Sequence, residues 1–115
     1  MKVIIAGTRR LWSISLVREA IVESGFDITE IITGGANGID QAADDVAVID
    51  GYARQVFPAD WDKYGKAAGS IRNREMADAG AEALIALPDI ESVGTHDMIA
   101  VMRKRNLPIF IKVIA

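Results

Sequence analysis

Short apolar runs alternate with segments of helical periodicity along this chain, and that alternation limits the fold more than any other feature. The runs are rich in β-branched residues and lie at 3–6, 31–33, 55–57, 83–87 and 109–114. None alternates strictly between apolar and polar residues, which is typical of parallel strands covered on both faces. The pattern therefore predicts five buried, parallel strands.

The segments between these runs predict helices. Ser13 can cap the first helix and Gly25 can end it. Gly51 and Gly80 stand where the second and third apolar stripes stop. The fourth segment carries basic residues at 103–105, which suit the negative end of a helix dipole.

Strands joined by helices imply parallel pairing with right-handed crossovers. We therefore predict an α/β protein, with a three-layer, doubly wound, Rossmann-like fold around a five-stranded parallel sheet. Residues 1–115 should form one domain, because this length is short for two independent cores. The longest irregular connection is expected at 58–69.

Composition excludes several classes of function. The chain has 115 residues, 50% of them apolar, and a net charge of -3, which excludes intrinsic disorder. It has no cysteine and one histidine, so we expect no disulfide, no metal site and no histidine-dependent catalysis. The acidic balance makes a nucleic-acid partner unfavourable. We find neither a membrane span nor a targeting segment, and expect a cytoplasmic protein.

In open α/β sheets, ligands bind beyond the carboxyl ends of the strands, where the strand order reverses. The loops that should meet there are 7–12, 34–40, 58–70 and 88–95. All four loops carry groups that a phosphate or a nucleotide needs.

The loop after the second predicted strand contains Gly34, Gly35 and Gly38, followed by Asp40. Glycines let the backbone approach an anion, and the following helix start offers free N–H groups. The alternative is a tight turn capped by Asn37, with Asp40 in capping-box position. Neither a GxGxxG fingerprint nor a GxxxxGK[ST] phosphate loop is present.

Two further loops carry glycine with a hydroxyl. Gly7 and Thr8 follow the first predicted strand, and Arg9 adds a guanidinium that could grip a phosphate. Gly94 and Thr95 open the fourth predicted helix in the same way. Taken singly, these are also compatible with a surface arginine and a plain helix cap.

The connection at 58–69 and the helix after it supply the remaining candidates. Trp61 or Tyr64 could stack on a base, or could only fix the loop to the domain. Arg72 could meet phosphate, or could pair with Glu75 on the surface. Asn73 is unfavourable inside a helix, so its amide should have a partner.

Taken together, these elements resemble the SLOG superfamily, which includes the DNA-processing protein DprA and the Lonely-guy phosphoribohydrolases. The likeness covers essentially the whole chain and is closest to small, stand-alone bacterial and phage members. The matching elements are Gly7-Thr8-Arg9, Thr33-Gly34-Gly35-Ala36 with Gly38 and Asp40, Ala68-Gly69 with Arg72-Asn73, and Ser92 with Gly94-Thr95.

The resemblance implies a Rossmann-like fold that binds a nucleotide or nucleotide-derived molecule. By position, the glycine-rich loop and Thr95 would contact phosphate, with Arg9 and Arg72 as cationic partners. The chain departs from the family pattern at Asn37, where arginine is common, and at Ser70, where proline is common. Of the enzymatic signature Pro-Gly-Gly-x-Gly-Thr-x-x-Glu, only Gly94-Thr95 remains, without the glutamate.

Three functions stay open at this level. The leading one is a module that senses or sequesters a nucleotide-like molecule, without cofactor or catalytic residue. The second is a nucleotide N-glycosidase that uses Asp40 or Asp60, and the third is single-stranded DNA binding. A homo-oligomer is also left open. The expected ligand-binding residues are Gly7, Thr8, Arg9, Gly34, Gly35, Gly38, Asp40, Arg72, Asn73, Gly94 and Thr95.

Overall fold

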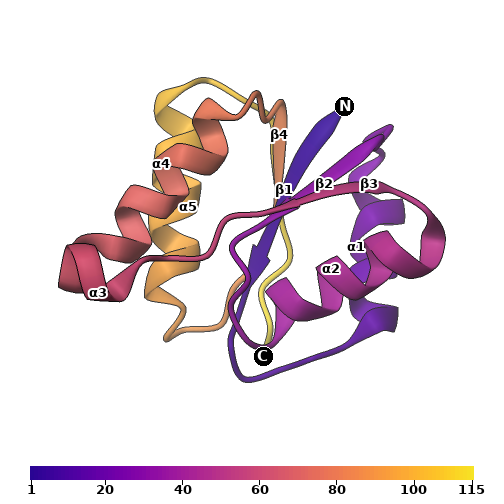
Figure 1. The fold of residues 1–115 in the computed structure, drawn as a ribbon. Helices are drawn as coiled ribbons and strands as arrows, with labels where there is room; N and C mark the ends of the chain where they lie inside the picture. The colour runs from indigo at the N-terminus through magenta and orange to yellow at the C-terminus, as the bar shows by residue number, and fades with distance from the viewer.

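A sheet of five parallel strands runs through the middle of the protein in a computed structural model that describes residues 1–115 (Figure 1). The strand order is β3-β2-β1-β4-β5. The chain thus adds strands outward from β1 to β3 and then returns to the other side of β1, which confirms the doubly wound parallel sheet. The strands are β1 (Lys2–Gly7), β2 (Glu30–Thr33), β3 (Ala53–Val56), β4 (Ala83–Leu87) and β5 (Ile109–Ile111).

Helices cover both faces of the sheet and make three layers (Figure 1). One face carries α1 (Ile14–Ser24) and α2 (Ile39–Asp50), and the other carries α4 (Ala68–Asp78) and α5 (Val93–Lys104). No helix is both long enough and apolar enough to cross a bilayer.

The central strands are apolar throughout because each face has its own core. In β1, Val3 and Ile5 pack with α1 and α2, whereas Ile4 and Ala6 pack with α4 and α5. Successive side chains of a strand point to opposite faces, so two covered faces require an uninterrupted apolar run. The prediction of buried strands is confirmed for β1, β2 and β4.

The predicted helix ends are confirmed where the cap chemistry is clear. The N–H of Leu16 donates to Ser13 Oγ at 3.1 Å, which satisfies one free donor at the start of α1. Gly25 and Gly51 end α1 and α2 in the left-handed conformation. The last turn of α5 contains the basic residues 103 and 104.

The prediction of an irregular connection at 58–69 is wrong. The segment forms a short helix, α3 (Trp61–Tyr64), and a 3-10 turn, η1 (Gly65–Ala67), before α4 begins at Ala68. Asp60 starts α3 by accepting a hydrogen bond from the N–H of Lys63 at 3.1 Å. These turns could not be predicted from the sequence, because they are exposed and therefore carry no apolar stripe.

The two edge strands also differ from the prediction. β3 lies at 53–56 instead of 55–57 and is mostly exposed, so it is not covered on both faces. β5 ends at Ile111 instead of Ile114, although the N–H of Ile114 still donates to Pro88 O at 2.8 Å. An edge strand has one neighbour and less cover, so its apolar pattern is a weaker guide.

A close backbone contact joins the loop before α2 to the loop after β1. Ile39 N–H donates to Thr8 O at 3.0 Å, and a Cβ added at Gly38 would lie 2.4 Å from the same oxygen. Gly38 also has a φ of 78°, a conformation that favours glycine. This glycine is therefore required by the packing of one loop on the other.

We predict that Gly38→Ala lowers the free energy of unfolding far more than Gly51→Ala. Both glycines have a positive φ, but nothing lies within 4 Å of a Cβ at Gly51. Gly51→Ala should therefore cost about 1 kcal/mol for conformation alone. Gly38→Ala should cost about 3 kcal/mol or more, because a backbone must also move. Urea denaturation measures both, and equal losses would contradict the packing role.

Candidate functional site, a polar cavity at the switch point

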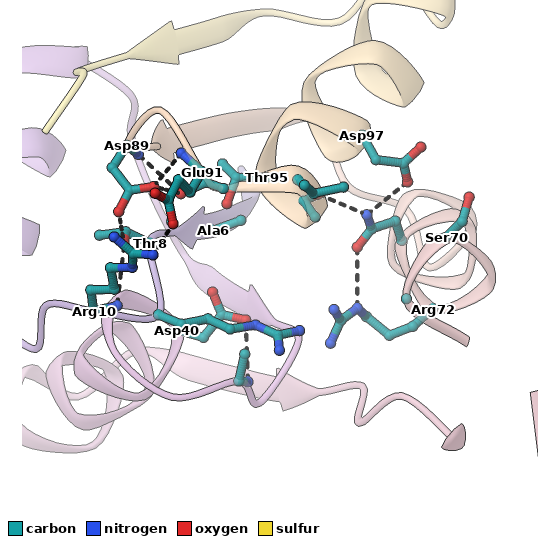
Figure 2. Close-up of a pocket in the computed structure, with 18 of the residues that line it drawn as sticks. Ala6, Thr8, Arg10, Asp40, Ser70, Arg72, Asp89, Glu91, Thr95 and Asp97 are labelled. Carbon is teal, nitrogen blue, oxygen red and sulfur yellow. Dashed lines mark hydrogen bonds and ion pairs between the residues drawn. The ribbon is translucent and has the colours of Figure 1, made fainter. Parts of the chain in front are cut away.

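A cavity of about 540 Å³ opens at the carboxyl ends of β1 and β4, where the strand order reverses (Figure 2). Its walls come from the loops after these two strands, the first turns of α2, α4 and α5, and Trp61 of α3. The volume lies within the range of roughly 300–1,000 Å³ that is usual for small-molecule sites. Most of the lining residues are polar, charged or glycine, which suits a polar ligand.

The cavity brings together residues from all four loops that the sequence singled out. Except for the three glycines of the 34–38 loop, every predicted site residue lines it. Sequence reasoning missed the charged lining residues Arg10, Asp89, Glu91 and Asp97. Arg10, Asp89 and Glu91 lie inside the loops predicted to meet at this edge, but charged residues are common in any loop and give no separate signal.

The glycines of the 34–38 loop do not line the cavity, but Gly34 and Gly38 pack against segments that do. A Cβ at Gly34 would lie 2.3 Å from Nη1 of Arg72, so only glycine leaves room for that guanidinium. Gly38 makes room for the backbone of the β1 loop, as described above. Gly35 is exposed and has a φ of 70°. Packing within the protein therefore accounts for Gly34 and Gly38, and their contact with a ligand stays a prediction.

The alternative in which Asn37 caps α2 is wrong. Gly38 occupies the N-cap position, no side chain caps this helix, and Asn37 is exposed. Asp40 instead reaches back from the first turn, and its carboxylate accepts a hydrogen bond from the N–H of Ala36 at 3.3 Å. The carboxylate thus holds the loop that precedes its own helix.

Asp40 is a buried carboxyl group that lines the cavity (Figure 2). Burial raises its pKa to about 6, because a charged carboxylate is poorly solvated there. The positive charge of Arg72 and the N–H groups of Ala36, Gly7 and Gly34 oppose this rise. Asp40 therefore titrates close to neutral pH, a property that is enriched in functional sites.

Asp60, the other carboxylate considered for catalysis, is exposed and outside the lining of the cavity. Its side chain caps α3. Asp40 is therefore the candidate of the pair that the cavity contains.

Arg72 and Asn73 form a buried network that joins three elements. Arg72 Nη1 donates to Gly34 O at 2.5 Å, and its Nε donates to Asn73 Oδ1 at 3.1 Å. Asn73 Nδ2 donates to Gly94 O at 3.1 Å and to Asp97 Oδ2 at 2.9 Å. The network links the loop after β2 to α4 and to α5. Figure 2 shows the part of it that runs from Arg72 toward Asp97.

Two sequence interpretations are decided by this network. The prediction that the amide of Asn73 has partners is confirmed. The alternative of a surface ion pair between Arg72 and Glu75 is wrong, because Arg72 is buried and bonded elsewhere. Its hydrogen bonds use Nε and Nη1, which leaves Nη2 without a partner in the protein, and the residue lines the cavity.

Polar contacts also tie the loop after β1 to the loop after β4. Thr8 Oγ1 donates to Asp89 Oδ2 at 2.6 Å, and the guanidinium of Arg10 pairs with Glu91. Hydrogen bonds from Thr8 and Ser92 hold the pKa of Asp89 below its usual range. These contacts fix the two loops on either side of the switch point.

Two arginines at the cavity wall, Arg9 and Arg72, are close enough to influence each other. Arg9 is exposed and forms no ion pair. Burial lowers the pKa of Arg72, Asp40 opposes this effect, and the charge of Arg9 lowers the pKa further. Arg9 is thus near enough to repel Arg72, and an anion between the two guanidinium groups would relieve that repulsion.

The first turn of α5 is left open toward the cavity. Ser92, at its N-cap, donates to Asp89 Oδ1 at 2.8 Å and makes no cap hydrogen bond. The N–H groups of Gly94 and Thr95 have no acceptor in the protein. Thr95 is 5% exposed, lines the cavity and has no hydrogen-bond partner for its hydroxyl. The first turn of α5 is thus not capped by a side chain of the protein.

The sheet order, the helices on both faces and the polar cavity at the switch point define a Rossmann-like α/β protein. The chain is 37% identical to the Gene 61 protein of Mycobacterium phage D29 over 84 residues, which are 69% of this chain and 67% of the phage protein. It belongs to the family of that phage protein. No family model and no solved structure matches the sequence.

We predict that Asp40 makes folding more favourable at low pH. Its pKa is 3.8 when unperturbed and about 6 in the fold, so the folded state binds the proton more tightly. This contribution is complete below pH 4 and is lost as the pH rises to about 6. One pKa unit corresponds to about 1.4 kcal/mol, so the loss should approach about 3 kcal/mol.

The measurement compares the wild type with Asp40→Asn by urea denaturation between pH 4 and pH 7. Asparagine keeps an oxygen for the N–H of Ala36 and removes the titration. The wild type should lose stability relative to the variant as the pH rises. A difference that does not change with pH would mean that Asp40 is not strongly perturbed.

Proposed function

We propose that the protein binds a phosphate-bearing nucleotide or nucleotide-derived molecule in this cavity, as a sensor or sequestering module. The observation that carries the proposal is the open start of α5, where the N–H groups of Gly94 and Thr95 and the hydroxyl of Thr95 face the cavity and have no partner in the protein. A bound phosphate would accept hydrogen bonds from all three.

The charges around α5 support an anionic ligand. A helix N-terminus carries partial positive charge and is a common phosphate site. Arg9 and the free Nη2 of Arg72 add positively charged donors to the same cavity. Asp89 and Glu91 are engaged by Thr8 and Arg10, which reduces their repulsion of an anion.

The same cavity disfavours a role in coating single-stranded DNA. Its lining mixes carboxylates with cations, and the net charge of the chain is -3. Proteins of that type use a positively charged groove that follows the backbone of the strand. We also propose that the family falls within the SLOG superfamily, because the elements that carry the resemblance surround one cavity.

We predict that nucleotides stabilise the fold, whereas free sugars and amino acids do not. A ligand at 100 times its Kd adds about 2.7 kcal/mol. For a domain near this size, the melting temperature should rise by on the order of ten degrees. A dye-based melting scan with AMP, GMP, cyclic AMP, ADP-ribose, ribose and glutamate tests this directly.

Two variants test where the phosphate of the ligand binds. Thr95→Val removes the hydroxyl and keeps the shape, and Arg9→Gln removes a guanidinium at the cavity. Each should weaken AMP binding by about 1.5–3 kcal/mol, the usual value of a hydrogen bond to a charged group. Arg74→Gln makes the same charge change on an exposed part of α4 outside the cavity, and should have no such effect.

The proposal fails if free sugars or amino acids stabilise the protein and no nucleotide does. It fails as well if Arg9→Gln and Arg74→Gln weaken binding equally, since the effect would then be one of net charge.

A second candidate function is hydrolysis of an N-glycosidic bond, and Asp40 is the observation that favours it. A carboxyl group with a pKa of about 6 is present in both protonation states near neutral pH. In this reaction the bond between ribose C1′ and the base nitrogen breaks, water adds its hydroxyl to C1′, and the nitrogen receives a proton. Asp40 could supply that proton, or stabilise the positive charge that develops at C1′.

We expect the binding function alone, and chromatography of incubated AMP and GMP decides between the two. Unchanged nucleotide supports a binding module. Release of free base that Asp40→Asn abolishes would establish the hydrolase instead.

A further inference from the structure

Trp61 is the one aromatic residue that lines the cavity. It is 50% exposed and belongs to neither of the two hydrophobic clusters beside the sheet. Burial of an indole is among the larger gains that a side chain can offer to a fold. About half of the surface of this residue is exposed at the wall of a polar cavity.

The other tryptophan shows that exposure alone does not explain Trp61. Trp12 is 54% exposed, but its Nε1 donates to Asp45 Oδ2 at 2.9 Å. Trp61 is exposed to a similar degree, and its indole nitrogen makes no hydrogen bond within the protein. The indole N–H of Trp12 is thus bonded within the protein, whereas the indole N–H of Trp61 is available to a ligand.

Trp61 is nevertheless held in place. Asp60 caps the turn on which it lies, and the N–H of Gly65 donates to Trp61 O. A Cβ added at Gly69 would lie 3.5 Å from Cη2 of Trp61, so the ring edge rests against the first turn of α4. A ring fixed by its edge loses little conformational freedom when a ligand stacks on it.

The cavity thus has two chemically different regions. The start of α5 offers Thr95 and free N–H groups to an anion, whereas Trp61 offers an aromatic surface from α3. Gly69, against which the ring edge lies, carries no charge. A ligand with a phosphate at one end and a flat aromatic group at the other matches both regions.

We propose that Trp61 recognises the base of the ligand by stacking, and that the cavity therefore selects nucleotides over sugar phosphates. This inference rests on the proposed function, because it assumes the phosphate at α5. Stacking is tolerant of sequence, and the larger face of a purine stacks better than that of a pyrimidine. AMP should consequently bind more tightly than CMP, and both more tightly than ribose 5-phosphate.

Fluorescence can test contact with the ring. The chain has two tryptophans, so in a Trp12→Phe variant Trp61 is the only one left. Titration with AMP should quench its emission, and titration with ribose 5-phosphate should quench it much less.

Calorimetric titration tests the contribution to affinity. Trp61→Leu should weaken AMP binding about tenfold or more, as expected for loss of one stacked base, and should leave ribose 5-phosphate unchanged. Tyr64→Leu is the matched control, because Tyr64 is an exposed aromatic residue on the same helix that does not line the cavity. It should bind both compounds like the wild type.

The outcomes separate the two proposals. If AMP and ribose 5-phosphate bind the wild type equally well, or if Trp61→Leu weakens both to the same degree, base recognition by Trp61 is overturned and phosphate binding at α5 survives. If no phosphate-bearing compound binds at all, the proposed function fails and this inference fails with it.

Discussion

The position of the buried Arg72 guanidinium governs the rest of the cavity. Its bonds to Gly34 O and Asn73 Oδ1, and those of Asn73 to Gly94 O and Asp97, hold the loop after β2 and the start of α5 at fixed distances from α4. A buried cation is costly unless hydrogen bonds compensate it. Gly34 has no side chain that would collide with this guanidinium. The nearby carboxylate of Asp40 favours its charged form.

Much of the fold could be predicted because burial leaves a direct mark on sequence. Strands with two covered faces must be apolar at every position, and β1 and β4 show this plainly. The same logic fails where burial is absent. The turns at 61–67 and the strand β3 are exposed, so no apolar pattern reveals them.

The location of the candidate site could be predicted from the sequence, but only some of the residues that line it could. The carboxyl ends of the strands indicated the right loops, because parallel strands deliver those ends to one edge. The role of Gly34 could not be read from the sequence, since it depends on a side chain 38 positions away. Likewise, Ser92 occupies the N-cap position of α5, but its hydroxyl bonds to Asp89. The N–H of Thr95 is therefore left without the acceptor that a capping serine would provide.

The bond between Thr8 and Asp89 joins residues 81 positions apart. Closing so long a loop costs chain entropy before any contact repays it, so such contacts form late in folding. The cavity accordingly has no precursor in either half of the chain. One wall is made by the first half and the other by the second, so a ligand held between them can bind only to a molecule in which the two halves have docked. A bound ligand would therefore also stabilise the contact between the two halves of the chain.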